Sequence, residues 1–277
     1  MSKLSLKSLL STNKSLLLPV AHDALTAKLI ELAGFKTFSI GGFGVAASAF
    51  GLPDNGSVGF SQFLPIFKNI LSASGLPALV DADTGYGGPK MAAKVVSTYE
   101  KAGASAVFIE DQAWPKRCGH TSGHKLISPN RMADKIASAK KSLVNPETIL
   151  MARTDAISAE GDLDAAIKRA KVYIQAGADA IFIEAPRTID ELKQIPEELP
   201  NTILLANMIE GGKTPLVKRD VLEKWGFRLI AHPLAGILAQ TKVIRDTLSF
   251  LKENGTTEGW GRDNLFDFTE FRQLIGL

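Results

Sequence analysis

Nearly continuous apolar runs alternate with amphipathic stretches along most of the chain. Runs rich in Val, Ile, Leu and Phe are typical of strands in a parallel sheet that is buried on both faces. The sequence predicts eight strands, at Leu16–Ala21, Thr37–Gly41, Ala78–Asp83, Ala106–Asp111, Thr148–Thr154, Ala180–Glu184, Thr202–Asn207 and Arg228–Ala231. The amphipathic windows predict helices at Leu4–Leu10, Ala24–Ala33, Gly59–Ser72, Pro89–Ala102, Pro129–Leu143, Asp162–Ala176, Ile189–Ile195, Val217–Lys224 and Gly236–Lys252.

A local repeat links the end of a helix to the start of a strand. Lys101–Glu110 is echoed by Gln175–Glu184, with fainter copies at Leu32–Phe35 and Lys224–Phe227. Each copy places a glycine just past a helix end, where a left-handed cap is needed. Repeated helix–glycine–strand units with eight strands predict an α/β fold, the (β/α)8 TIM barrel. The alternative is a doubly wound open sheet, but no Gly-x-Gly-x-x-Gly pattern follows the first strand.

Composition places the chain among ordinary globular proteins. It has 277 residues, 45% hydrophobic and 22% charged, which suits one barrel domain over residues 1–277 with a C-terminal helical segment at about residues 236–277. A net charge of +3 without arginine-rich runs predicts no nucleic-acid partner. No apolar run approaches the length of a membrane span. Cys118 is the only cysteine, which excludes an internal disulfide and predicts a reducing, cytoplasmic location.

Carboxylates gather at the C-terminal ends of the predicted strands, where barrels of this kind build their sites. Asp81 and Asp83 lie two positions apart in one strand, so both side chains are expected to face the barrel axis, and Glu110 lies in the next strand. Buried carboxylates are costly unless a cation pairs with them, and an all-oxygen site favours Mg²⁺ or Mn²⁺. We therefore predict a metal site at these three residues. The alternative is that Asp83 only caps the next turn.

Cys118 lies in the most polar stretch of the sequence, together with Lys116, Arg117 and His120. Neighbouring cations favour the thiolate, so we expect Cys118 to serve as an acid or base rather than as a buried, inert thiol. Lys116 would favour the thiolate and attract an anion, and His120 would orient this segment or a substrate oxygen. The alternative for Lys116 and His120 is a solvated loop residue.

Three further polar residues lie at the ends of later strands. Arg153 offers a planar fork for a substrate carboxylate, unless it pairs with Asp155 or Glu184. Glu184 is a candidate to position substrate or metal-bound water, unless it pairs with Arg187. Asn207 is a candidate donor to a carboxylate or enolate oxygen, with a loop hydrogen bond as the alternative.

The chain resembles the isocitrate lyase/phosphoenolpyruvate mutase superfamily in five motifs, at Val80–Gly87, Glu110–Gln112, Lys116–His120, Ala152–Asp155 and Ala206–Met208. The resemblance runs from about Leu4 to the C-terminus, with the motifs in the family's order. It is strongest to the group that contains 2,3-dimethylmalate lyase, methylisocitrate lyase and the petal death protein. The resemblance implies Mg²⁺ held by Asp81, Asp83 and Glu110, directly or through water. It also implies a homotetramer in which the last helices swap between subunits.

The implied chemistry is cleavage of the C2–C3 bond of a 2-hydroxy dicarboxylate, which gives a 2-oxo acid such as pyruvate and a second carboxylate. Cys118, on a gating loop at about residues 112–127, would protonate the leaving carbon, with Lys116 and His120 beside it. The base is open between Tyr86, Glu184 and metal-bound hydroxide. The residues expected to bind substrate are Gly41, Gly42, Phe43, Asp54, Gly119, Arg153, Glu184 and Asn207.

Several positions depart from the family pattern. Gly41 stands where the family has the serine of a Ser-Gly-Gly loop, and His22 stands where relatives often have Tyr. Leu238 replaces an arginine that methylisocitrate lyases use for a third carboxylate, which favours a dicarboxylate substrate. Pro233 replaces a serine associated with oxaloacetate hydrolysis, which favours a lyase. The alternatives are an oxaloacetate hydrolase or decarboxylase, a phosphonopyruvate-type mutase or hydrolase, and a non-catalytic barrel that binds a 2-oxo acid.

Overall fold

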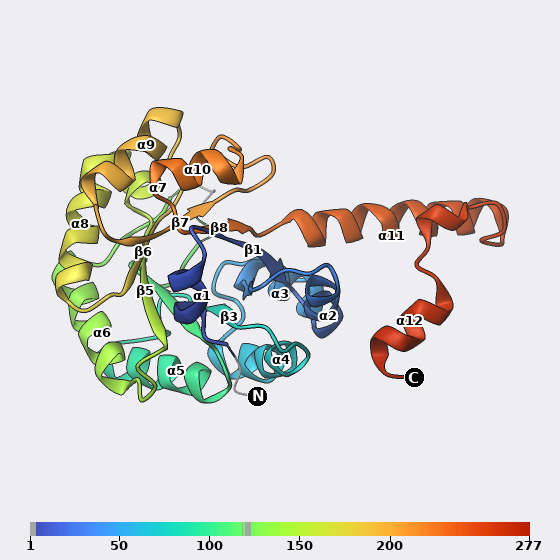
Figure 1. The fold of residues 1–277 in the computed structure, drawn as a ribbon, viewed down its shortest axis with the longest axis horizontal. Helices are drawn as coiled ribbons and strands as arrows, with labels where there is room; N and C mark the ends of the chain where they lie inside the picture. Colours follow the sequence, from blue (N-terminus) through green and yellow to red (C-terminus); the bar gives the residue numbers. More distant parts are fainter. Residues whose placement is uncertain (1–3, 118, 120–122) are drawn as a thin grey trace.

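A computed structural model describes residues 4–117, 119 and 123–277 and shows a closed barrel of eight parallel strands (Figure 1). The strands are β1 (Leu16–Ala21), β2 (Phe38–Ile40), β3 (Ala78–Asp81), β4 (Ala106–Glu110), β5 (Ile149–Thr154), β6 (Ala180–Ile183), β7 (Ile203–Asn207) and β8 (Leu229–His232). They pair in chain order, and the pairing of β1 with β8 closes the barrel, with Leu16 opposite Leu229. The predicted (β/α)8 barrel is confirmed.

Helices cover the outside of the barrel, as the amphipathic windows predict. They are α2 (Ala24–Leu32), α4 (Phe60–Ser72), α5 (Pro89–Lys101), α6 (Pro129–Ser142), α8 (Leu163–Gln175), α9 (Ile189–Glu198) and α10 (Arg219–Trp225). The short first helix, α1, spans Leu6–Thr12 rather than Leu4–Leu10. It begins later because Ser5 is its N-cap: the Ser5 hydroxyl accepts a hydrogen bond from the Ser8 N–H at 2.9 Å.

Several short elements are not visible in the sequence pattern. They are α3 (Gly42–Val45), the π-helical turn η1 (Ala46–Phe50), α7 (Ala156–Glu160) and the 3₁₀ turn η2 (Arg262–Asn264). One helical turn is too short to show a 3.6-residue period. Because α3 and α7 follow β2 and β5, both lie at the C-terminal end of the barrel, where the polar strand ends gather.

Apolar side chains close the N-terminal end of the barrel. Leu79 and Phe108 belong to a buried cluster inside the barrel, and Leu6, Leu9 and Leu10 of α1 complete it. A second, larger buried cluster fills the space between the strands and the surrounding helices. The polar strand ends at the opposite, C-terminal end therefore form the only mouth that the described part of the barrel offers for a site.

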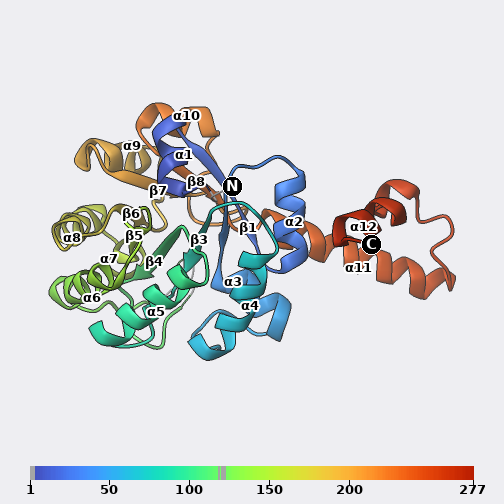
Figure 2. The same ribbon diagram turned by 60° about the horizontal axis from the view of Figure 1, so that its bottom comes forward.

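The last helices leave the barrel. In Figures 1 and 2, α11 (Ala235–Asn254) extends away from β8, and α12 (Phe268–Ile275) lies apart from the barrel. Neither helix has a buried residue among those described, although both carry large apolar side chains such as Leu248 and Phe268. No helix in the described ranges combines the length and apolar character that a bilayer span requires.

The role of α1 can be measured by truncating one side chain. Leu6 is 0% exposed, so Leu6→Ala should lower the free energy of unfolding by about 2–5 kcal/mol through the cavity it leaves. Leu4 is 64% exposed, and Leu4→Ala should change the stability little. Chemical denaturation at equal protein concentrations measures both variants. Equal stabilities would show that α1 does not close the barrel core.

Candidate active site

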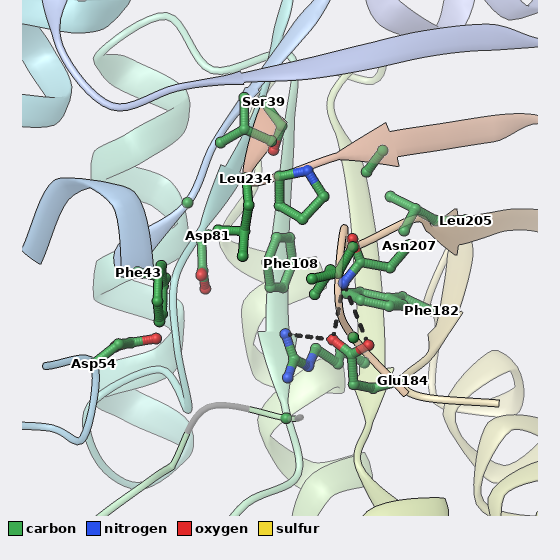
Figure 3. A pocket seen from close by; sticks show the side chains of 18 of the residues that line it. Ser39, Phe43, Asp54, Asp81, Phe108, Phe182, Glu184, Leu205, Asn207 and Leu234 are labelled. Carbon is green, nitrogen blue, oxygen red and sulfur yellow. Dashed lines mark hydrogen bonds and ion pairs between the residues drawn. The ribbon is translucent and has the colours of Figure 1, made fainter. Parts of the chain in front are cut away.

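A cavity of about 270 Å³ opens at the C-terminal end of the barrel. Figure 3 shows Asp54, Phe43 and Asp81 on one side of it and Glu184 and Asn207 on the other. Its lining also includes Gly41, Phe108, Glu110, Lys116, Arg117, Gly119, Arg153, Phe182, Leu205, Ile209, Pro233 and Leu234. Among the described site candidates, Gly42, Asp83 and Tyr86 do not line this cavity. Those that do are Gly41, Phe43, Asp54, Asp81, Glu110, Lys116, Gly119, Arg153, Glu184 and Asn207.

Asp81 and Asp83 come together by a turn and not by strand alternation. β3 ends at Asp81, and Asp83 has a φ of +49°, so the expectation that both lie along one strand is wrong. The Asp81 carboxylate accepts hydrogen bonds from the Asp83 N–H at 2.9 Å and from the Gly42 N–H at 3.1 Å. A Cβ atom built on Gly42 would lie 3.5 Å from an oxygen of each aspartate. The left-handed turn thus brings the second carboxylate back beside the first.

Lys116 is buried among these acids. Its ammonium forms ion pairs with Asp54, at 2.5 Å, and with Asp83. Burial lowers the pKa of Lys116, but the carboxylates of Asp83 and Asp54 raise it well above the ordinary lysine value. Lys116 is therefore a fixed cation at the carboxylate cluster. Cys118 and His120, with which the sequence groups it, lie outside the described residues.

The carboxylate cluster carries more negative charge than one lysine balances. Burial, and then the neighbouring Asp83 carboxylate, raise the pKa of Asp81 to about 6. Burial raises the pKa of Glu110 well above its ordinary value, although Arg153 opposes this. One oxygen of Glu110, Oε1, is buried and has no hydrogen-bond partner among the described residues. The two raised pKa values and the unpartnered oxygen indicate that a further cation would stabilise the charged carboxylates.

The donor set fits a hydrated divalent cation. Within the described ranges no three His, Cys, Asp or Glu side chains converge as a ready-made set of ligands. Asp81, Asp83 and Glu110 nevertheless offer only oxygen atoms, which Mg²⁺ prefers, and Mg²⁺ usually keeps several of its waters in protein sites. These three residues therefore suit a cation bound partly through water.

Arg153, in β5, is held by carboxylates on several sides. Its guanidinium donates two hydrogen bonds to Asp155, at 2.8 and 3.0 Å, and lies 3.2 Å from Glu184 and 3.4 Å from Glu110. It also lies 5.0 Å from the ring centre of Phe182. The structure thus shows the ion pairs that the sequence allowed as the alternative for Arg153. The side chain still lines the cavity, with its orientation fixed.

Glu184 and Asn207 form the opposite side of the cavity (Figure 3). The Asn207 amide donates to the two carboxylate oxygens of Glu184 at 3.2 and 3.3 Å, and one of these oxygens, Oε1, also accepts a hydrogen bond from the Ala185 N–H at 2.9 Å. Ala185 has a φ of +58°, a conformation that is uncommon for residues other than glycine. These contacts hold the Glu184 carboxylate in one orientation beside Arg153.

Gly119 brings the backbone of the segment after β4 into contact with this cluster. A Cβ atom on Gly119 would lie 2.5 Å from Arg153 Nη2 and 2.8 Å from an oxygen of Asp155. The Gly119 carbonyl accepts a hydrogen bond from the Ser158 hydroxyl at 2.7 Å. Only glycine allows so close an approach. No sequence pattern indicated Ser158, because α7 is too short to show one.

Tyr86 lies behind the carboxylates. Its hydroxyl donates to Asp83, and its ring lies 6.2 Å from that of Trp114, in a second hollow beside α4 and α5. Burial, and then the Asp83 carboxylate, raise the pKa of Tyr86. It does not line the cavity, whereas Gly41 and Phe43 do. Leu238 is 46% exposed on α11 and does not line the cavity of its own chain either.

The apolar lining contains residues that sequence reasoning missed. Phe108 and Phe182 lie two positions before Glu110 and Glu184, so a period of two places each pair on the same, inward side. The two rings pack edge to face, with their centres 5.9 Å apart. The repeat in the sequence could therefore have identified both as the floor of the site.

Comparisons with known proteins agree with the barrel fold. Residues 6–252 match the family model of phosphoenolpyruvate phosphomutase. The chain is 42% identical over 272 residues to 2,3-dimethylmalate lyase of Eubacterium barkeri, covering 98% of this chain and 93% of that protein. The structure of oxaloacetate acetylhydrolase with 3,3-difluorooxalacetate superposes with a TM-score of 0.92 at 30% identity, covering 98% and 92%. Phosphonopyruvate hydrolase with oxalate and Mg²⁺ gives 0.87 at 27% identity, covering 98% and 93%.

The close approach of Gly119 predicts the effect of one methyl group. Gly119→Ala should displace this backbone from Arg153 and lower kcat/KM by about 10²-fold, the usual cost of a misplacement near 1 Å. Gly88→Ala is the matched control, because a Cβ atom there meets nothing within 4 Å. Steady-state kinetics and thermal unfolding measure both variants. Wild-type kinetics for Gly119→Ala would contradict the described approach.

Proposed function

The chain belongs to the isocitrate lyase/phosphoenolpyruvate mutase superfamily, and we propose that it is a carbon–carbon lyase acting on a 2-hydroxy dicarboxylate. The substrate would resemble 2,3-dimethylmalate or 2-methylisocitrate. Cleavage of its C2–C3 bond would release a 2-oxo acid such as pyruvate and a second carboxylate. The observation that carries the proposal is the division of the cavity into charged and apolar walls.

The charged walls come from β3 to β7, and the apolar wall comes from β8 and β1. On the apolar wall Val20, Ala231, Pro233 and Leu234 line the cavity. Among the described residues of that wall there is no cation for a third carboxylate. A substrate with an alkyl group on this side and its hydroxyl and carboxylates on the charged side would satisfy both. We therefore favour a 2-alkylmalate or 2,3-dialkylmalate over a tricarboxylate.

Asp81, Asp83 and Glu110 would hold Mg²⁺, or Mn²⁺, directly or through water. When bound, the ion supplies Lewis acidity to the 2-hydroxyl and the adjacent carboxylate. The support is the all-oxygen donor set, the unpartnered oxygen of Glu110, and a related hydrolase solved with Mg²⁺ and oxalate. Lys116 would balance the remaining charge of Asp54 and Asp83 and attract the anionic substrate.

The protein's own groups would orient the substrate and move two protons. Arg153 and Asn207 would donate to a carboxylate, with the backbone N–H groups of Gly41 and Phe43 at the other end of the cavity. A base removes the hydroxyl proton, the C2–C3 electron pair passes to the leaving carbon, and Cys118 protonates that carbon. Glu184 faces the cavity and is the better placed base; Tyr86 instead donates to Asp83.

The alternatives receive unequal support. An oxaloacetate hydrolase is favoured by the close superposition on oxaloacetate acetylhydrolase, but Pro233 offers no hydroxyl at the cavity wall. Phosphonopyruvate chemistry is represented among the related structures and stays a second alternative. Membership of an enzyme family counts against a barrel that only binds a 2-oxo acid.

The assembly we propose is a homotetramer in a reducing, cytoplasmic setting. The support is the arm formed by α11 and α12, which leaves the barrel and exposes apolar side chains including Ile244, Leu248 and Leu251. A second copy would cover these side chains by exchanging the last helices. The single cysteine needs no oxidising compartment.

A substrate panel tests the proposed reaction. The protein would be incubated with 2-alkylmalates, 2,3-dimethylmalate, methylisocitrate and oxaloacetate, with Mg²⁺ or with EDTA, and 2-oxo acid release followed. We expect Mg²⁺-dependent release from an alkylmalate and a loss of at least about 10²-fold in Cys118→Ser, because the general acid is missing. Oxaloacetate loss with no reaction of the malates would replace the lyase by the hydrolase or decarboxylase.

The apolar wall predicts a change of specificity. Leu234→Arg places a cation on that wall, so kcat/KM for 2,3-dimethylmalate should fall by about 10–200-fold, as expected for a lost alkyl contact. The loss for methylisocitrate should be smaller, because its third carboxylate gains a partner. Leu32→Arg, on the exposed end of α2, is the control. An equal loss for both substrates would contradict the assignment of this wall.

A further inference from the structure

We propose that Ser158 is a positioning residue for the active site, an inference that rests on the proposed function because it concerns the same cavity. The Ser158 hydroxyl donates to the Gly119 carbonyl at 2.7 Å. Gly119 lines the cavity, and Ser158 lies outside it on α7. The bond thus joins a rigid element of the barrel to a backbone atom beside the reacting groups.

The Ser158 end of this bond is fixed. Helix α7 directly follows β5, where Thr154 donates to the buried Asp111 carboxylate at 2.7 Å and the Asp155 N–H donates to it at 3.1 Å. Arg169 of α8 donates to Glu160 at 2.8 Å, at the other end of α7. Because α7 is tied at both ends, the hydrogen bond constrains Gly119 and not the helix.

The middle of α7 is tied as well. The guanidinium of Arg187, from the loop after β6, donates to the Ile157 carbonyl at 2.8 Å. The residue next to Ser158 in the helix is therefore held by a second strand end of the barrel. Ser158 is thus presented from a support that β5, β6 and α8 share.

The Gly119 end lies against the charged cluster. A Cβ atom on Gly119 would come within 2.5 Å of both Arg153 Nη2 and Glu184 Cγ, so the backbone there leaves almost no free space. On the N-terminal side of the segment, the Gln112 side chain bonds the Arg117 N–H at 2.8 Å and the Arg117 carbonyl at 2.9 Å. Gln112 thus restrains the backbone at Arg117, and Ser158 restrains it two residues later, at the Gly119 carbonyl.

The consequence for catalysis follows from the sequence. Gly119 stands between Cys118 and His120 in the sequence. A displacement of the Gly119 carbonyl therefore changes the orientation of the peptide bond that joins Gly119 to His120. Losing the Ser158 hydroxyl should leave the barrel intact, because Ser158 is only partly buried and water can replace its hydroxyl at the Gly119 carbonyl. The effect should therefore appear in kcat/KM and in the hydrogen exchange of backbone amides near Gly119, and not in the overall stability.

The test compares Ser158→Ala with Ser158→Thr and with the control Ser142→Ala. Ser142, on α6, also donates its hydroxyl to backbone carbonyls, those of Ala139 at 2.7 Å and Ala93 at 3.0 Å, away from the site. Hydrogen–deuterium exchange of peptides that contain Gly119 reports the restraint without any substrate. Steady-state kinetics on the best substrate of the panel, and thermal unfolding, complete the comparison.

We expect faster exchange in Ser158→Ala confined to the Gly119 peptides, a loss of about tenfold in kcat/KM as for one lost hydrogen bond, and an unchanged Tm. Ser158→Thr, which keeps the hydroxyl, should restore the wild-type exchange and kcat/KM. Ser142→Ala should match the wild type in exchange and in kcat/KM. Unchanged exchange in Ser158→Ala, or faster exchange with unchanged kcat/KM, would overturn the proposal. If the wild type turns over no acid of the panel, the proposed lyase fails, while the exchange comparison still decides whether Ser158 holds Gly119.

Discussion

The arrangement of the site depends on the cost of burying carboxylates together. Asp81, Asp83 and Glu110 are buried at the C-terminal end of the barrel and face like charges. Burial of this kind is tolerated only when cations and hydrogen bonds compensate. Lys116 enters from the segment after β4, and Arg153 comes from β5, so the acids themselves determine where these two parts of the chain lie.

The ion pairs at the carboxylate cluster also explain why the apolar wall of the cavity matters for substrate selection. Two of the cations that line the cavity, Lys116 and Arg153, are engaged by acids of the protein. A substrate is therefore selected by the charge that it adds to this cluster and by how it fills the wall of Val20, Ala231 and Leu234. A divalent cation would add positive charge at the cluster, and this charge would attract an anionic substrate.

Much of this structure could be predicted from the sequence. Continuous apolar runs and the glycine after each repeated helix indicated the eight strands, because a buried parallel sheet leaves no alternation. The carboxylates were found because a barrel exposes its C-terminal strand ends. The position of the Asp83 carboxylate beside that of Asp81 could not be predicted in this way, because it depends on a left-handed turn after Asp81. The partners of Lys116 and the contact of Ser158 with Gly119 depend on tertiary placement, which no local pattern encodes. The predicted roles of Cys118 and His120 stay predictions.

The most direct test of the account is to run the reaction in D₂O and locate the deuterium in the products. If C2–C3 cleavage is followed by protonation from an exchangeable group of the protein, 2,3-dimethylmalate should give pyruvate and propionate with one deuterium at C2 of the propionate. Mass spectrometry and proton NMR of the separated products measure this. Products without deuterium at that carbon, or no cleavage into two fragments with Mg²⁺ present, would contradict the proposed lyase.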